Sequence, residues 1–186
     1  MPIPRRSFLK SAAAAASVGS LHDLVAQSIA RPVAGEVHLV GAGQDRFGEA
    51  RLMGFSRLNF KVGSAETNGG LFIVENANLS TGGGPPLHYH LSQDEWFFAM
   101  EGKVAVQVGD RKLELNAGES VLAPRLIPHT WSAVIPGSRL LGVFSPAGKV
   151  EQFFRDVNGH PELQANAEFV SKYEMQLVGP SPFWKS

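Results

Sequence analysis

The chain has 186 residues, of which 44% are hydrophobic, and its 17 basic residues are matched by 17 acidic residues. This length suits a single domain with a substantial core. Without a basic stripe, the chain lacks the electrostatic footprint of a nucleic-acid-binding protein. Since it contains no cysteine, disulfides, thiolate metal ligands and cysteine nucleophiles are excluded, so any metal site must use imidazole and carboxylate groups.

The N-terminal stretch differs in character from the rest of the chain. The run RRSFLK at residues 5–10 precedes an alanine-rich, weakly hydrophobic segment. It resembles a twin-arginine export signal, whose core is two arginines, a variable residue and then Phe-Leu-Lys. The alternative is an ordinary N-terminal helix, which alanine favours. We expect residues 1–30 to be a signal peptide and residues 31–186 a single mature domain, periplasmic or secreted, without membrane contact.

The middle of the chain reads as a succession of short β-strands separated by Gly, Pro and Asx turns. Strands that recur at roughly eight to twelve residues are typical of an antiparallel sandwich or barrel. Within Lys103–Val108, for example, valine occupies every second position, which places the valines on one face of a strand. We expect strands at Leu58–Val62, Leu71–Leu79, Trp96–Met100, Lys103–Val108, Lys112–Leu115, Ser120–Ala123, His129–Val134 and Leu140–Phe144.

The C-terminal part changes to a helical pattern. Apolar residues recur at helical spacing in Val150–Val157 and in Leu163–Tyr173. We therefore expect a barrel over about residues 50–147 and a helical tail over residues 148–186, with one or two helices packed on the barrel. Residues 179–184 have the composition of an extended closing tail.

The stretch GGGPPLHYHLSQDEWFF at residues 82–98 carries the chemistry. In a β-strand His88 and His90 project to the same face, and Glu95 follows on the next strand after a short turn. A carboxylate beside two imidazoles suits Fe, Mn, Co, Ni, Cu or Zn. Antiparallel strands can return His129 as a fourth ligand. The alternative is that these histidines only form hydrogen bonds in the core.

The same residues resemble the first cupin motif, which is Gly, five residues, His-x-His, three or four residues, Glu, six residues and Gly. All of its fixed positions are filled, by Gly82, His88, His90, Glu95 and Gly102.

The second cupin motif is matched with two departures. Gly118, Pro124 and His129 fit the pattern, whereas Leu126 replaces a glycine and Ala133 replaces an asparagine. Neither departure touches a candidate ligand. The loss of glycine at Leu126 predicts a less sharp turn before His129. The resemblance covers at least residues 70–147 and implies an all-β cupin fold, the double-stranded β-helix or jelly-roll barrel.

Within the cupins, the chain is similar to single-domain proteins of the quercetin 2,3-dioxygenase type, over roughly residues 50–183. The features that carry this likeness are Glu66–Gly70, Pro85–His90, Asp94–Phe97, Phe144–Gly148 and Gln152–Arg155.

This likeness implies a function. His88, His90, Glu95 and His129 would hold one divalent transition metal. Glu95 would also be catalytic and take the proton from the hydroxyl of a flavonol or similar enolisable aromatic. Dioxygen would then attack the ring, which opens with release of carbon monoxide. Sites with nitrogen and oxygen ligands bind Cu and Zn more tightly than the earlier metals. If the metal is loaded before export, the site is filled before it meets Cu and Zn, which favours Fe, Mn, Ni or Co, with Zn or Cu as the alternatives.

Aromatic and apolar residues should line the site so that it accepts a flat substrate. The candidates are Phe60, Phe72, Met100, Trp131 and Phe144, and the alternative for each is plain barrel core. His22, His38 and His160 lie outside the metal pattern and are set aside.

Two rival functions use the same ligands. One is a different metal-dependent cupin enzyme, and the other is a cupin that binds a metal or small ligand without turnover. In the dioxygenase hypothesis the partners are a small-molecule substrate and dioxygen, with no nucleic acid, and the family's habit of pairing barrels favours a homodimer.

Overall fold

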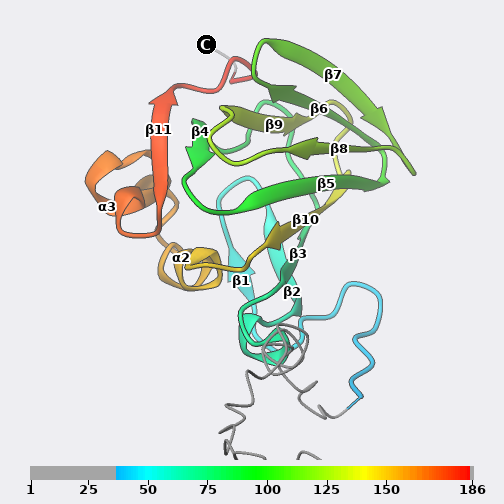
Figure 1. Ribbon diagram of the computed structural model, residues 1–186. Helices are drawn as coiled ribbons and strands as arrows, with labels where there is room; N and C mark the ends of the chain where they lie inside the picture. The colour runs from blue at the N-terminus through cyan, green and yellow to red at the C-terminus, as the bar shows by residue number, and fades with distance from the viewer. Residues whose placement is uncertain (1–36, 185–186) are drawn as a thin grey trace, which may run out of the picture. The chain divides into compact units, whose positions relative to one another are not determined.

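The computed structural model describes residues 37–184 and forms two antiparallel sheets (Figure 1). The predicted signal peptide, residues 1–30, lies outside the described residues. The first sheet has the order β1 (Arg51–Leu52), β2 (Arg57–Val62), β3 (Phe72–Ala77), β10 (Arg139–Ser145), β5 (Asp94–Glu101) and β8 (Ser120–Ala123). The second has the order β11 (Met175–Gly179), β4 (Leu87–His90), β9 (His129–Ala133), β6 (Lys103–Val108) and β7 (Arg111–Asn116).

The strand predictions are confirmed with small shifts of their ends. The main difference is at Leu71–Leu79, because β3 ends at Ala77. The sequence pattern missed β1 and β11. In β11 the exposed face carries Val178 as well as Gln176, so apolar and polar residues alternate only weakly in the sequence. The strand forms by pairing with β4, where Met175 lies opposite His90 and Leu177 opposite His88. No helix in the described part of the chain is long and apolar enough to cross a membrane.

Alternation along β5 decides which side chains face the interior. Glu95, Phe97 and Ala99 are buried, whereas Trp96 and Met100 on the opposite face are only partly buried. Because successive side chains of a strand point to opposite faces, the carboxylate of Glu95 shares the interior with the apolar core.

The C-terminal tail contains short helices. The helix expected at Val150–Val157 is present as α2 (Val150–Asp156), which buries Val150, Phe153 and Phe154. The single segment expected over Leu163–Tyr173 is instead divided into η2 (Pro161–Ala165) and α3 (Ala167–Ser171).

The division occurs at Asn166, whose side chain accepts a hydrogen bond from the backbone amide of Phe169 at 2.9 Å and caps α3. Asparagine is a preferred residue at this position because its side chain satisfies an amide that the first turn leaves free. Two short elements therefore replace one longer helix, and the first of them brings Gln164 inward.

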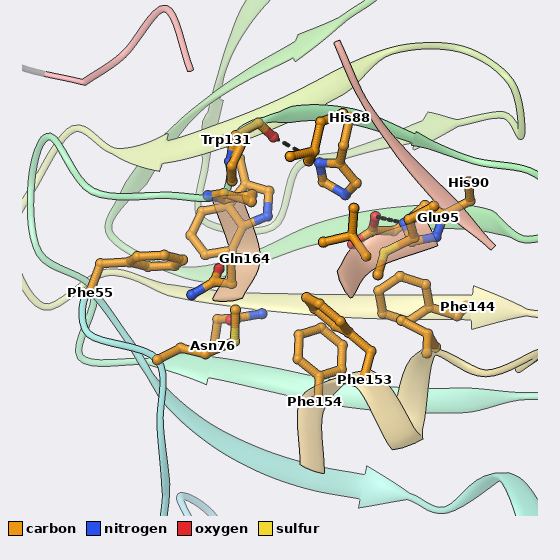
Figure 2. Close-up of a pocket in the computed structure, with 17 residues that line it drawn as sticks. Phe55, Asn76, His88, His90, Glu95, Trp131, Phe144, Phe153, Phe154 and Gln164 are labelled. Carbon is orange, nitrogen blue, oxygen red and sulfur yellow. Dashed lines mark hydrogen bonds and ion pairs between the residues drawn. The ribbon is translucent and has the colours of Figure 1, made fainter. Parts of the chain in front are cut away.

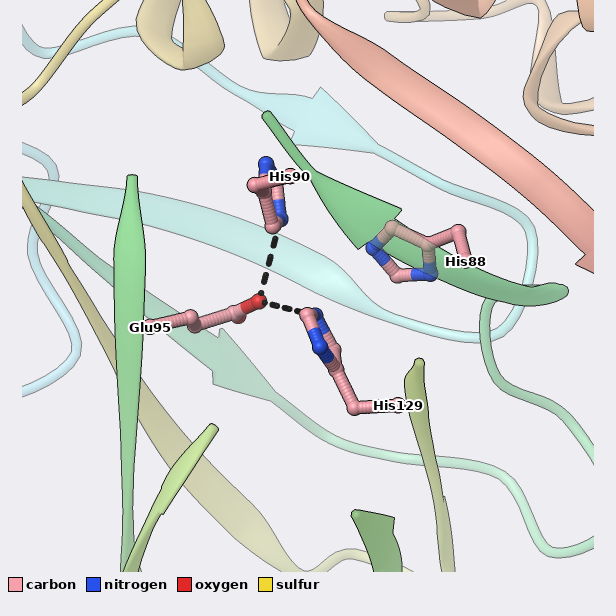
Figure 3. Close-up of side chains that lie close together, drawn as sticks. All are labelled: His88, His90, Glu95 and His129. Atoms are coloured by element: carbon pink, nitrogen blue, oxygen red, sulfur yellow. Dashed lines mark hydrogen bonds and ion pairs between the residues drawn. The ribbon is translucent and has the colours of Figure 1, made fainter. Parts of the chain in front are cut away.

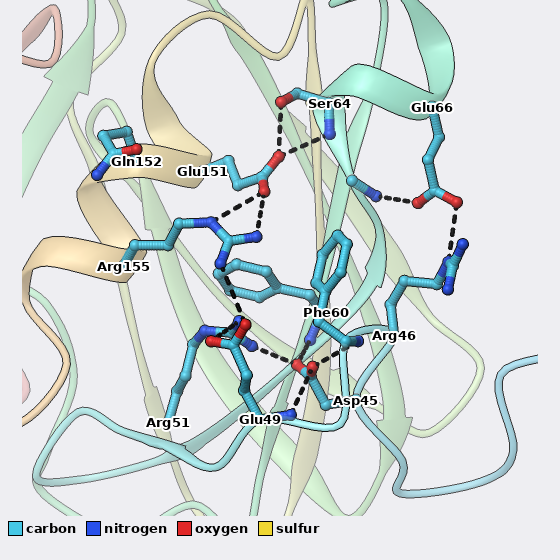
Figure 4. Close-up of polar contacts among 12 residues, drawn as sticks. Asp45, Arg46, Glu49, Arg51, Phe60, Ser64, Glu66, Glu151, Gln152 and Arg155 are labelled. Atoms are coloured by element: carbon cyan, nitrogen blue, oxygen red, sulfur yellow. Dashed lines mark hydrogen bonds and ion pairs between the residues drawn. The ribbon is translucent and has the colours of Figure 1, made fainter.

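A buried ion pair holds the segment before β2 against the sheet (Figure 4). The guanidinium of Arg51 lies 2.5 Å from Asp45 Oδ2 and 3.8 Å from the ring centroid of Phe60. Asp45 also accepts hydrogen bonds from the backbone amides of Phe60 and Phe47, each at 2.8 Å. Burial opposes ionisation of Asp45, but these hydrogen bonds and Arg51 lower its pKa below the ordinary range.

A second set of contacts joins this region to α2. Arg155 pairs with Glu151 at 2.7 Å and with Glu49 at 3.5 Å, and Glu49 also pairs with Arg51 (Figure 4). Glu151 in turn accepts hydrogen bonds from the amide and hydroxyl of Ser64 in η1 (Ser64–Thr67), at 2.7 and 2.6 Å. The position of α2, whose phenylalanines reach the site described next, is thus fixed by charged side chains on its outer face.

Candidate metal centre

Three strands bring the four predicted ligands together (Figure 3). His88 and His90 lie on β4, Glu95 on β5 and His129 on β9, and His88 stands directly opposite His129 across the β4–β9 pair. One ligand atom from each residue lies within 4.8 Å of the other three. A single cation can therefore reach all four, although their role as ligands stays a prediction.

The carboxylate of Glu95 is the centre of the group. Its Oε2 atom lies 3.0 Å from Nε2 of His129 and 3.3 Å from Nε2 of His90. The imidazole of His88 completes the set, with its ring centroid 4.7 Å from that of His129.

Backbone carbonyls orient two of the imidazoles. Nδ1 of His88 lies 2.8 Å from the carbonyl oxygen of Pro86, and Nδ1 of His129 lies 2.9 Å from that of Ile127. Because a carbonyl only accepts, each Nδ1 carries the hydrogen and each neutral ring keeps its lone pair on Nε2. The Nε2 lone pair of His129 then faces Glu95 Oε2, so two acceptors meet and a cation between them satisfies both. The donor set and its orientation fit a bound metal ion.

The turn before β4 is built for close contact. Gly84 has a φ of 135°, and a Cβ atom there would lie 1.9 Å from the carbonyl oxygen of Trp131. No other residue fits. The hydroxyl of Thr130 donates to the carbonyl of Pro85 at 2.6 Å, so the chain enters β4 in a fixed direction and His88 is placed accurately.

The turn before His129 differs from the expectation. Leu126 adopts a φ of 66°, the left-handed backbone usually reserved for glycine, so the prediction of a less sharp turn is wrong. A leucine in this conformation costs about 1–2 kcal/mol. Its amide donates to the carbonyl of His90 at 2.8 Å, and this bond fastens the loop that leads to His129 onto the strand that carries His90.

The environment favours the neutral form of His88 and His90 and the charged form of Glu95. Burial, together with the neighbouring His129 and His90, lowers the pKa of His88 to about 3. Burial also lowers the pKa of His90, against the opposing effect of Glu95. For Glu95 burial opposes ionisation, but the adjacent imidazoles of His129 and His90 hold its pKa at about 2. At neutral pH the site offers the neutral nitrogens of His88 and His90 and one anionic oxygen from Glu95, groups suited to divalent transition metals.

Sequence reasoning missed one polar neighbour of the site. Gln93 is fully buried, and its amide affects both His90, whose pKa it raises, and Glu174, whose pKa it lowers. These contacts are looser than hydrogen bonds of normal geometry, since neither amide atom of Gln93 has a hydrogen-bond partner in the described chain. Gly148, with a φ of 51°, leaves the room that this side chain occupies. A glutamine two residues before the motif glutamate was the only available signal.

A cavity with mainly apolar walls opens onto this group (Figure 2). The space between its walls is about 540 Å³ when the open solvent at its mouth is included. His88, His90 and Glu95 line it, whereas His129 does not and closes the group from behind. Its apolar walls include Phe55, Trp131, Phe144, Phe153 and Phe154.

The predicted pocket residues divide into two groups. Trp131 and Phe144 line the cavity, but Phe60, Phe72 and Met100 do not. Phe60 and Phe72 are fully buried in the core with ring centroids 4.9 Å apart, and Phe72 lies behind Phe144 at 6.0 Å. Met100 lies on the face of β5 opposite Glu95.

Helix α2 contributes two aromatic residues to the cavity wall that the sequence did not predict. Phe153 and Phe154 line the cavity, whereas Phe60, Phe72 and Met100 do not. The helical spacing of Val150, Phe153 and Phe154 was the signal that one face of α2 packs inward.

Comparisons with known proteins agree with this geometry. The family model for the cupin domain matches residues 77–137, a range that holds all four candidate ligands. Quercetin 2,3-dioxygenase of Bacillus subtilis (strain 168) is 28% identical over 105 residues, which are 56% of this chain and 31% of that protein. The chain thus spans about a third of the length of the curated relative it matches. These matches support the cupin superfamily.

Two solved structures show the fold. KdgF from Halomonas sp. aligns with a TM-score of 0.52 and 18% identity, over 60% of this chain and 94% of its own. An RmlC-like cupin from Shewanella frigidimarina aligns with a TM-score of 0.52 and 22% identity, over 63% of this chain and 96% of its own. The predicted all-β cupin barrel with C-terminal helices is confirmed.

Proposed function

We propose that this chain is a metal-dependent cupin oxidoreductase, a dioxygenase that acts on a flavonol or a similar enolisable aromatic. The observation that carries the proposal is a group of three imidazoles and one carboxylate, within 4.8 Å of one another, that opens onto a cavity with aromatic walls. The likeness to quercetin 2,3-dioxygenase over 105 residues supports the choice of substrate class.

The metal would be held by His88, His90, Glu95 and His129. When bound, a divalent transition metal supplies Lewis-acid stabilisation of a deprotonated substrate oxygen and redox chemistry with dioxygen. The chain itself handles the proton. Glu95 lines the cavity and is ionised at neutral pH, so its carboxylate can accept the proton of the enolisable hydroxyl. His88 and His129 keep their orientation through the carbonyls of Pro86 and Ile127.

The walls of the cavity position the ring and exclude water. Trp131 and Phe144 come from the barrel, and Phe153 and Phe154 come from α2. Faces and edges of aromatic side chains pack well against a flat aromatic ligand. A dry environment also strengthens the electrostatic interactions on which deprotonation of the substrate depends.

Oxygen uptake tests this function. Metal-loaded protein incubated with flavonols in air should consume dioxygen and release carbon monoxide in equal amounts, and the anaerobic sample should do neither. In Glu95→Gln, turnover should fall by about a hundredfold or more because the base is lost. Absence of oxygen uptake across a panel of flavonols and other enolisable aromatics would overturn the proposal and favour a cupin that binds metal without turnover.

The metal is part of the proposal. We propose Mn, Fe, Co or Ni, loaded in the cytoplasm before export by the twin-arginine route, because N/O sites bind copper and zinc more tightly once exposed to them. Elemental analysis of protein isolated from its native compartment should find one of these four metals. Stoichiometric zinc or copper in that sample would contradict this choice.

A further inference from the structure

A surface groove adjoins the metal cavity. It is lined by the glycine run Gly82–Gly84, by Pro161 and Ala165 of η2, and by Trp184. Met53, Phe55, Pro86 and Gln164 line both the groove and the cavity, whereas His88, His90 and Glu95 line only the cavity. The four shared side chains mark where the groove meets the cavity. Pro86 lies beside His88, whereas Figure 2 draws Phe55 and Gln164 away from His90 and Glu95.

Gln164 is the polar member of this set. Its side chain is 5% exposed, and its Nε2 atom donates to the carbonyl of Pro161 at 3.2 Å. That bond assigns the two ends of the amide. Its Oε1 atom is buried and has no hydrogen-bond partner in the described chain. A buried acceptor without a partner is unfavourable, and proteins seldom retain one without a reason.

Another amide in the cavity wall is already engaged. Oδ1 of Asn76 accepts a hydrogen bond from the hydroxyl of Ser56 at 3.1 Å. Figure 2 draws Asn76 and Gln164 on the side of Phe55, away from His90, Glu95 and Phe144. Of the two amides, Gln164 is the one whose oxygen remains free.

We infer that Oε1 of Gln164 accepts a hydrogen bond from a hydroxyl at the end of the substrate remote from the metal, and so determines specificity. The inference rests on the proposed function, because it takes the metal group to hold the enolisable oxygen. The substrate class is then a flat aromatic with that oxygen at one end and a second hydroxyl at the other. An acceptor selects for such a donor, since a ligand without it leaves Oε1 unpaired.

The test compares two ligands and three variants by anaerobic binding. Quercetin carries ring hydroxyls in addition to the enolisable one, whereas 3-hydroxyflavone has only the latter. Titration of metal-loaded protein, followed by quenching of tryptophan fluorescence, should show wild type preferring quercetin by about tenfold or more. Gln164→Met keeps the size of the side chain without the acceptor and should abolish this preference. Gln164→Glu restores an acceptor oxygen and should retain it.

The matched control is Gln152→Met. Gln152 lies on α2, donates to Asp156 at 2.8 Å and does not line the cavity, so the preference should be unchanged. Metal content equal to wild type in every variant shows that the barrel is intact.

Three outcomes overturn the inference, namely a preference that survives in Gln164→Met, a preference lost in Gln164→Glu as well, or failure of wild type to bind either compound. Turnover is measured separately in air. If the preference for quercetin depends on Gln164 but no oxygen is consumed, the proposed dioxygenase activity is refuted and the role of Gln164 in specificity stands. If oxygen is consumed but wild type shows no preference, the role of Gln164 is refuted and the dioxygenase activity stands.

Discussion

Nε2 of His129 lies 3.0 Å from Oε2 of Glu95, while Nδ1 of the same imidazole is bonded to the carbonyl of Ile127. A neutral ring cannot donate through both nitrogens, so the Glu95 side of His129 carries a lone pair. Two acceptors at this separation in a buried site require a proton or a metal ion between them. A metal ion between them would satisfy both acceptors, and for this reason we interpret the cluster as a candidate metal centre.

The ligand set leads to the first prediction. His88→Ala and His129→Ala should each reduce bound metal from about one equivalent per chain to a small fraction, because each removes one of four ligands, and both should lower the melting temperature of metal-loaded protein. Elemental analysis and thermal unfolding measure these effects. His160→Ala is the matched control, because His160 is exposed and paired with Glu162 at 3.4 Å, far outside the ligand group. Equal metal content in all three variants would refute the site.

A second prediction concerns Gln93, the buried amide beside His90. His90 lacks the backbone carbonyl that orients His88 and His129, and Gln93 is the neighbouring side chain that can take this role. Gln93→Leu should weaken metal affinity by about 10–100-fold, the usual effect of removing a group that orients a metal ligand. Competition with a chelator measures the change.

Two further variants sharpen this test. In Gly148→Ala the new Cβ would lie 1.6 Å from Nε2 of Gln93, so affinity should fall in the same direction. Gln107→Leu is the control, since Gln107 lies on β6 and donates to the carbonyl of Gly109. Unchanged affinity in Gln93→Leu would show that the amide only fills space.

The low pKa of His88 gives the third prediction. Its value of about 3 in the folded protein lies below the ordinary 6.5, so between these values the unfolded chain binds more protons than the folded one. The free energy of unfolding of metal-free protein should therefore fall as pH decreases from 6.5 towards 3. Glu95, with a pKa of about 2 against 4.5, acts in the same direction at lower pH.

Urea unfolding at a series of pH values, after chelation of metal, measures this dependence. His88→Gln should show a flatter dependence between pH 6.5 and 3. A midpoint that stays constant over this range in wild type would contradict the environment described for His88.

The fourth prediction tests the buried ion pair outside the site. Arg51→Ala should lower the free energy of unfolding by about 3–5 kcal/mol, because it leaves the carboxylate of Asp45 buried without its partner. The side chains of Arg51 and Asp45 are 1% and 2% exposed. Lys103→Ala is the control, since it breaks an exposed pair with Glu114 and should cost about 1 kcal/mol or less. If urea denaturation gives the same loss of unfolding free energy for Arg51→Ala and Lys103→Ala, burial does not make the Arg51–Asp45 pair more important for stability than an exposed pair.

Much of the fold could be predicted because strand patterns are local. The valines of Lys103–Val108 and the leucines of Lys112–Leu115 alternate with a period of two. This period assigns each side chain to a face without knowledge of the rest of the chain. β11 was missed because its alternation is weak and it forms by pairing with β4. The helical spacing over Leu163–Tyr173 did not reveal that the segment divides into η2 and α3 at Asn166, whose side chain caps α3. The export signal, the domain limits and the homodimer stay predictions.

The candidate site divides in the same way. The sequence by itself determined the types of the candidate ligands and their order, because His88 and His90 share a strand face and Glu95 follows one turn later. Only the tertiary structure decided that Leu126 turns like a glycine, and that Phe153, Phe154 and Gln164 form the far walls of the cavity. Those positions depend on how distant segments pack. Helical spacing indicates that one face of α2 is buried, but it does not indicate which part of the barrel that face meets.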